Sequence, residues 1–189
     1  MIYLAEKGLA LDRVEVDLDG GEQRTPAYLA KNPAGKAPVL ELDDGTFLPE
    51  SAAIVEYLEE LYPDPPMIGT TPLARAQVRS IERLMADLYP RLSLYFQHSQ
   101  PLFRELGRVR QIPAIAEALG AEVEHYFHIL EEYNAGREFL AGDRPTVADC
   151  TAFPALRRAE EKFGYTIPAR FGRLYGWYSR FSERPSTRF

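Results

Sequence analysis

The chain is poor in the residues that build covalent or metal-based scaffolds. Its 189 residues include one cysteine and three histidines. These are too few for a disulfide framework or a cysteine-based zinc cluster, and we expect no metal site. Long apolar runs are missing too, since no segment approaches the roughly 18 consecutive apolar residues of a membrane-spanning helix. The amino end reaches Glu6 and Lys7 too soon for a signal peptide. We therefore expect a soluble, cytoplasmic protein with no membrane partner.

An excess of positive charge is also missing. The 22 lysines and arginines against 28 acidic residues give a formal net charge of −6. This balance disfavours a broad basic face and therefore a nucleic-acid partner. Hydrophobic residues make up 46% of the chain and charged residues 26%, which is typical of a folded globular protein. The length suffices for one large domain or two small ones.

Proline divides the chain into two parts of different texture. The segment Tyr62-Pro63-Asp64-Pro65-Pro66 holds three prolines in four residues and cannot continue a helix. Before it, short apolar stretches alternate with turn signals, and from Pro72 onward the apolar pattern is helical and long. We predict a small mixed α/β domain over 1–62, a linker over 63–71 and an all-helical domain over 72–189.

The first part predicts helix, strand, helix, hairpin and helix in that order. Gly8 is placed to stop the first helix, and Asp43-Asp44-Gly45 is a hairpin turn signal. The expected elements are a helix at Met1–Lys7, a strand at Arg13–Leu18, a short helix from Thr25-Pro26, a hairpin of Val39–Leu42 and Thr46–Leu48, and a helix at Ser51–Leu61.

Helices dominate the second part. Two long apolar stripes with a period of 3.6 residues start near Val78 and Ile112, and shorter helices are expected at Thr146–Phe163 and Phe171–Phe181. Thr146-Val147-Ala148-Asp149 fits a capping box, in which Asp149 reaches back to the backbone of Thr146. We expect Cys150 to be a buried apolar residue and not a nucleophile.

Two segments of the first domain can carry chemistry. Pro38 lies where the chain enters a strand, and a cis bond there would free the backbone of Ala37 to pair with an extended peptide. Glu50-Ser51 starts a helix, where Ser51 can cap it, and the free N–H groups attract an anion while Glu50 can hold an ammonium group. Taken separately, the two segments fit an ordinary loop and simple capping equally well or better.

Together these segments resemble the glutathione transferase family, whose amino-terminal domain is thioredoxin-like. The resemblance extends over nearly the whole chain. Its matching stretches are Leu4-Ala5-Glu6-Lys7-Gly8, Asn32-Pro33-Ala34-Gly35-Lys36-Ala37-Pro38-Val39-Leu40, Glu50-Ser51-Ala52-Ala53-Ile54 and Thr146-Val147-Ala148-Asp149.

The resemblance implies roles for individual residues. Pro38 would be cis, and the backbone of Ala37 would bind the cysteinyl part of glutathione. Glu50 and Ser51 would hold the γ-glutamyl end. It also implies that Lys36 assists a carboxylate of the tripeptide, and that Tyr89, on the first long helix, lines a pocket for a hydrophobic electrophile. A solvated surface lysine is an equally good account of Lys36, and packing in the apolar stripe of the helix is the alternative for Tyr89.

The residue that activates the glutathione thiol is not among these matches. In the family, a strand and a loop with Ser, Tyr or Cys precede the first helix, and here Met1 already falls inside that helix. The resemblance therefore places the catalytic residue upstream of Met1. We expect a native start further upstream, with a truncated product as the alternative, and weak or absent conjugation by the 189-residue chain.

The fold class expected is α/β plus all-α, a thioredoxin-like domain followed by a helical one. The function implied is a cytosolic glutathione transferase that acts on electrophiles as a homodimer, with glutathione as co-substrate and no metal. The helix at Ser51–Leu61 and the residues Arg75, Arg79 and Arg83 are the expected dimer contacts. Two alternatives remain open: a non-catalytic interaction protein of the stringent starvation type, and a glutathione-dependent disulfide oxidoreductase.

Overall fold

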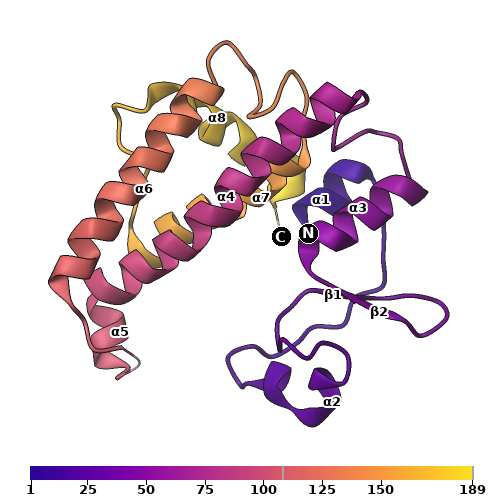
Figure 1. Ribbon diagram of the computed structural model, residues 1–189, viewed down its shortest axis with the longest axis horizontal. Coiled ribbons are helices and arrows are strands. Elements are labelled where there is room, and N and C mark those ends of the chain that lie inside the picture. Colours follow the sequence, from indigo (N-terminus) through magenta and orange to yellow (C-terminus); the bar gives the residue numbers. More distant parts are fainter. Residues whose placement is uncertain (108, 189) are drawn as a thin grey trace. The chain divides into compact units, whose positions relative to one another are not determined.

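The computed structural model describes residues 1–107 and 109–188, and the chain forms two compact units (Figure 1). One unit is Lys7–Pro66. The other joins Met1–Glu6 to Met67–Phe189. The first six residues thus group with the helical unit, whereas the sequence-based range began the first domain at residue 1. The limits of the domain at 1–62, the linker at 63–71 and the domain at 72–189 remain predictions.

A short hairpin forms the centre of the Lys7–Pro66 unit. Strand β1 (Val39–Glu41) pairs antiparallel with β2 (Phe47–Pro49), and Leu40 lies opposite Leu48. Gly45 takes a φ of 82° in the turn between them, which a glycine adopts without strain. The hairpin is flanked by the 3₁₀ turn η1 (Glu22–Arg24) and the helices α2 (Pro26–Leu29) and α3 (Ser51–Leu61). The predicted hairpin and both predicted helices are confirmed.

The predicted strand at Arg13–Leu18 is wrong. Residues 9–17 are irregular and end in a turn, and Val14 is 90% exposed. The sheet in the described part of the chain consists of β1 and β2, so no neighbouring strand lies beside this segment. Alternation of apolar and charged residues indicates two faces, but an extended segment becomes a strand only when its backbone pairs with another.

Helix α1 (Ile2–Lys7) ends as predicted, with Gly8 at a φ of 70°. Its last residue, Lys7, is buried and anchored within the Lys7–Pro66 unit. The Lys7 ammonium lies 2.7 Å from a carboxylate oxygen of Glu59 on α3, and it donates a hydrogen bond of 2.7 Å to the carbonyl of Pro65. Both charges of this pair are hidden from water, so each depends on the other.

In the described residues after Pro66, the chain forms five helices and a final 3₁₀ turn. The long helix α4 packs against α6 and α7, and α8 contacts both of these (Figure 1). Their bounds are α4 Pro72–Ser99, α5 Pro101–Glu105, α6 Pro113–Tyr133, α7 Val147–Phe163, α8 Gly172–Ser182 and η2 Pro185–Thr187. The core contains large side chains that are almost completely buried: Ile81, Leu88, Leu92, Phe127, Phe153, Leu174, Trp177 and Phe181. No helix in 1–107 or 109–188 is both long enough and apolar enough to cross a bilayer.

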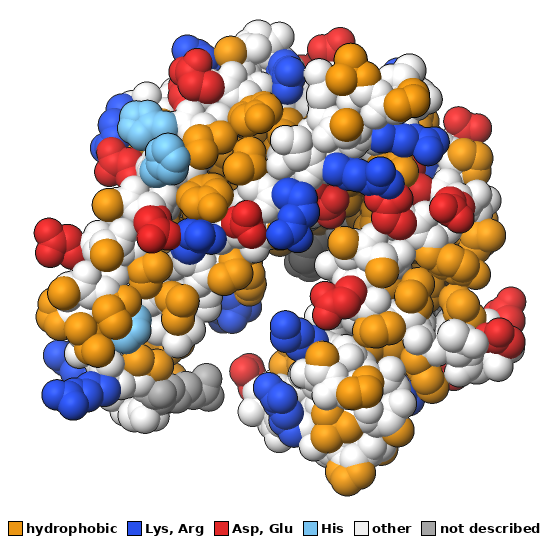
Figure 2. Space-filling model, in the orientation of Figure 1, with side chains coloured by type: hydrophobic (Ala, Val, Ile, Leu, Met, Phe, Trp, Pro, Cys, Tyr) orange, Lys and Arg blue, Asp and Glu red, His pale blue; other side chains and the backbone are white. Residues whose placement is uncertain are grey.

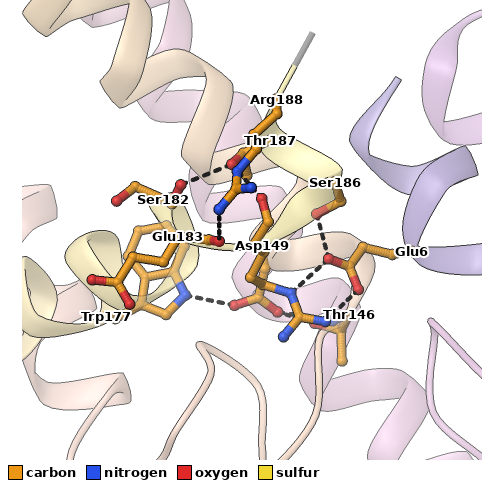
Figure 3. A network of polar contacts seen from close by, with 10 residues as sticks. Glu6, Thr146, Asp149, Trp177, Ser182, Glu183, Ser186, Thr187 and Arg188 are labelled. Carbon is orange, nitrogen blue, oxygen red and sulfur yellow. Dashed lines mark hydrogen bonds and ion pairs between the residues drawn. The ribbon is translucent and has the colours of Figure 1, made fainter.

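The predicted capping box opens α7 and belongs to a larger network (Figure 3). The backbone N–H and the hydroxyl of Thr146 both donate to Asp149 Oδ2, at 2.8 and 2.9 Å. The Leu140 N–H and the indole N–H of Trp177 donate to Oδ1, at 2.9 and 2.7 Å. The neighbouring Cys150 is half-buried and not fully buried as predicted, and burial raises the pKa of its thiol, which disfavours a nucleophilic role.

A second network joins the two ends of the helical unit (Figure 3). The guanidinium of Arg184 donates two hydrogen bonds to the Glu6 carboxylate, at 2.6 and 2.7 Å, and the hydroxyl of Ser186 donates to the same carboxylate. These contacts bring α1 against the η2 segment, 178 residues later in the chain.

Candidate functional site

The loop before β1 is held by two buried side chains. The Asn32 amide donates a 2.7 Å hydrogen bond to the Lys36 carbonyl and accepts one of 3.0 Å from the Ala34 N–H. The Tyr28 hydroxyl donates to the same Lys36 carbonyl at 2.9 Å. Asn32 is 2% exposed and Tyr28 is 8% exposed, so the side-chain ends of these three hydrogen bonds are shielded from bulk water. The conformation of the loop is therefore fixed just before its exposed residues.

Gly35 is a position where only glycine fits. Its φ is 59°, and a Cβ atom built there would lie 2.9 Å from the carbonyl oxygen of Gln23 and 3.1 Å from the Arg24 guanidinium. A side chain would meet both a strained backbone conformation and a fixed backbone atom. Gly35 lets the loop approach the η1 turn closely.

The Ala37–Pro38 peptide bond is cis, as predicted. Lys36, Ala37 and Pro38 are all exposed. No hydrogen bond within the described residues engages the N–H or the carbonyl of Ala37. An extended peptide can therefore pair with the backbone of Ala37 by strand addition.

Glu50 and Ser51 are both exposed at the start of α3. The residue that caps the helix differs from the predicted one. Glu50 occupies the N-cap position and Ser51 is the first helical residue, so the expectation that Ser51 caps the helix is wrong. Glu50 has a φ of 69°, the one positive φ of a non-glycine residue in the described part of the chain. Such a conformation costs about 1–3 kcal/mol and is found at ligand-binding positions.

The hairpin register brings these segments together. Val39 is paired with Pro49, so Pro38 and Glu50 continue the two strands at the same end of the hairpin. Lys36, Ala37 and Ser51 follow at that end because they are near neighbours in the chain. This end offers a free backbone, a carboxylate and the N-terminus of a helix of 11 residues. An elongated zwitterionic peptide suits such a set of groups.

Tyr89 is not part of the Lys7–Pro66 unit that carries these groups. It belongs to α4 in the helical unit, and its side chain is 51% exposed. Its role in a pocket for an electrophile remains a prediction. Among the residues that the structure describes, no group of three or more His, Cys, Asp or Glu side chains could hold a metal ion.

Sequence reasoning missed the residues that position the site. The side chains of Tyr28 and Asn32 reach the exposed residues of the site at one atom, the carbonyl oxygen of Lys36. Asn32-Pro33 is a turn signal, which could have indicated a role for the Asn32 side chain. Nothing in the local pattern around Tyr28 indicates that its hydroxyl reaches eight residues along the chain.

Comparisons with known proteins agree with this arrangement. A small α/β unit with a cis-proline beside a hairpin, followed by a helical unit, defines a protein of the glutathione transferase fold. Residues 1–66 match the glutathione S-transferase N-terminal domain model, and residues 95–185 match the C-terminal domain model. The chain belongs to the glutathione S-transferase family, as its sequence predicted.

Individual relatives cover most of the chain. A maleylacetoacetate isomerase of Pseudomonas aeruginosa is 38% identical over 89% of this chain and 78% of its own. Glutathione S-transferase 2 of Saccharomyces cerevisiae is 33% identical over 99% of this chain and 81% of its own. The structure of a glutathione S-transferase domain-containing protein from Marinobacter aquaeolei superposes with a TM-score of 0.84 at 37% identity, over 98% of this chain and 92% of its own.

Proposed function

We propose that the protein binds glutathione and conjugates its thiolate to electrophilic small molecules. The observation that carries this proposal is the common end of the hairpin, where the free backbone of Ala37 lies near the start of α3. Glutathione is an extended peptide with an ammonium group and a carboxylate at its γ-glutamyl end. Its chemistry complements the groups at this end of the hairpin.

Each part of the tripeptide has a partner in this arrangement. The cysteinyl backbone would pair with Ala37, the ammonium group with Glu50, and the adjacent carboxylate with Ser51 and the first N–H groups of α3. Lys36 is exposed and would assist the other carboxylate. Held in this way, the thiol is positioned for attack, which accounts for much of the catalysis in bimolecular reactions. Thiol activation by a Ser, Tyr or Cys remains a prediction from the family resemblance.

Calorimetric titration with glutathione tests the proposal. The double variant Glu50→Gln, Ser51→Ala should bind roughly ten- to a hundred-fold more weakly, because the loss of one charge-assisted hydrogen bond costs about 1.5–3 kcal/mol. Glu60→Gln, an exposed change later in the same helix, is the control and should bind like the parent chain. Equal affinity of the double variant and the parent would remove these residues from the site. A parent chain that binds no glutathione would favour the non-catalytic interaction protein.

A related reaction, isomerisation, is a second candidate. Relatives named maleylacetoacetate isomerase include the Pseudomonas protein and one from Rattus norvegicus, 32% identical over 84% of this chain. A thiolate that adds reversibly to an activated double bond allows rotation before it leaves, so the same glutathione site would serve. Conjugation consumes one thiol for each product, whereas isomerisation returns it. Titration of free thiol during turnover distinguishes the two activities. Thiol should be consumed with a generic aromatic electrophile if the protein conjugates, and should stay constant with maleylacetoacetate if the protein isomerises. For either activity, we propose that the protein is a homodimer and that it is located in the cytoplasm.

A further inference from the structure

Large apolar side chains are exposed at one end of the helical unit. Leu102 and Leu106 lie one turn apart at α5, and Ile112 and Ile115 lie one turn apart at the start of α6. Between 37% and 52% of each residue is exposed. Figure 2 shows hydrophobic side chains gathered at this end of the molecule, where Figure 1 places α5. We call these four residues with Arg104 and Arg110 the α5 tip.

Hydrogen bonds tie the chain just before α6 to the end of α4. The Gln111 amide donates to the carbonyls of Gln97 and Gln100, at 3.1 and 2.6 Å, and so caps the end of α4. The Ile112 N–H donates to Nδ1 of His98 at 3.2 Å. Ile112 is thus held beside the end of α4, where α5 begins.

The α5 tip is basic although the chain is acidic. Residues 98–117 contain three arginines against two glutamates, Glu105 and Glu117, in a chain with a net charge of −6. Arg104 and Arg110 are exposed, and neither forms an ion pair within the described residues, while Arg108 lies outside them. Exposed leucines and isoleucines beside unpaired arginines combine two attractions, one for a hydrocarbon phase and one for negative charge.

We propose that the α5 tip docks on an anionic phospholipid surface. A phospholipid headgroup layer offers negative charge with apolar chains directly beneath, and projecting side chains can enter it without a preformed groove. A second copy of the chain is a poorer match, because a two-fold contact would set the arginines of one tip against those of the other. The sequence led us to expect no membrane partner because no segment can span a bilayer, but surface docking requires no span.

Co-sedimentation with vesicles tests the proposal. The chain should sediment with phosphatidylcholine vesicles that contain phosphatidylserine, and added salt should weaken this binding. Pure phosphatidylcholine vesicles should bind little of the protein. The pair Arg104→Glu, Arg110→Glu and the pair Leu102→Ser, Leu106→Ser should each weaken binding roughly tenfold or more. The arginine pair leaves the apolar side chains in place, so it tests the proposal even if the serine pair is less stable.

Matched changes elsewhere are the controls. Leu73→Ser replaces a leucine that is 68% exposed, and Arg158→Glu reverses an exposed arginine on α7. Both should sediment like the parent chain, as should the variant Glu50→Gln, Ser51→Ala, because docking does not depend on glutathione. Equal binding to neutral and anionic vesicles, or equal loss in the controls, would overturn the proposal. Loss of a dimer in light scattering of the tip variants would also overturn it, by assigning the tip to a second copy.

Discussion

Asp149 receives four hydrogen bonds although none of its surface touches water. Burial raises the pKa of this carboxyl, and the four donors that point at it oppose the rise. Through these bonds one residue fixes the start of α7, the chain at Leu140 and the indole of Trp177 on α8. Its main role is therefore to satisfy donors that would otherwise be buried without a partner.

The variant Asp149→Ala should lower the free energy of unfolding by about 3 kcal/mol or more. Two backbone N–H groups and the Trp177 N–H would lose their acceptor while buried, and each such loss costs about 1–3 kcal/mol. Urea denaturation followed by tryptophan fluorescence measures the change. Asp143→Ala, at an exposed position in the preceding loop, should change the free energy of unfolding little. A similar loss in both variants would contradict this role of Asp149.

Local patterns explain which residue contacts were predictable. The bond between Thr146 and Asp149 spans three residues, so the local sequence predicts it as a capping box. The bond between Asp149 and Trp177 spans 28 residues, and no local pattern specifies a contact between residues so far apart in the chain. At Glu50-Ser51 the sequence correctly predicted the start of a helix. The prediction assigned the N-cap to Ser51, because serine is the commoner N-cap residue and no sequence pattern indicates the positive φ of Glu50.

Helix α8 begins on a carboxylate supplied by another helix. Glu131 of α6 accepts hydrogen bonds from the backbone N–H groups of Arg173 and Leu174, at 3.0 and 2.8 Å. No side chain caps α8 from its own N-cap residue, Phe171. The Glu131 carboxylate therefore satisfies donors at the positive end of the helix and holds α8 against α6.

Glu131→Ala should reduce the free energy of unfolding by about 1–2 kcal/mol, the usual cost of losing an N-terminal cap. Glu132→Ala is the matched control, because its side chain is 77% exposed and has one long contact with Arg173. Thermal denaturation followed by circular dichroism measures both. Equal melting temperatures for the two variants would show that Glu131 does not cap α8.

Elements were predictable where their signals are local. The hairpin followed from Asp43-Asp44-Gly45, and the helices followed from apolar periodicity with proline or glycine at their ends. The strand at Arg13–Leu18 failed because pairing depends on a second segment, which alternation does not specify. For the same reason the sequence could not predict that Glu131 caps α8, since 42 residues separate Glu131 from Arg173.

The helical unit is closed by the pair of Glu6 and Arg184. Burial alone would raise the pKa of Glu6, but the hydrogen bonds from Arg184 and Ser186 and the charge of Arg184 outweigh it, so the pKa lies below its usual value of 4.5. A lowered pKa in the folded state means that the ionised carboxylate stabilises the fold. This contribution is complete above the unfolded-state pKa and disappears as the pH falls through the folded-state pKa.

Glu6→Gln should therefore cost stability at neutral pH and little in acid. We expect the variant to lose about 1–2 kcal/mol at pH 7, since the pair is partly open to solvent, and the difference from the parent to shrink below about pH 4.5. Urea denaturation at several pH values measures this, with Glu183→Gln as an exposed control. A difference that stays constant down to pH 3 would contradict the assignment.

The same pair also determines how the protein responds to a pulling force. A force that pulls on the η2 segment would reach Arg184 before it reaches α8. The guanidinium would be drawn away from Glu6, and α1 would lose this contact while α8 and α7 are still wound. Traction on the segment after α8 would thus weaken the attachment of α1, which the buried side chains of Ile2 and Tyr3 would then hold without the ion pair.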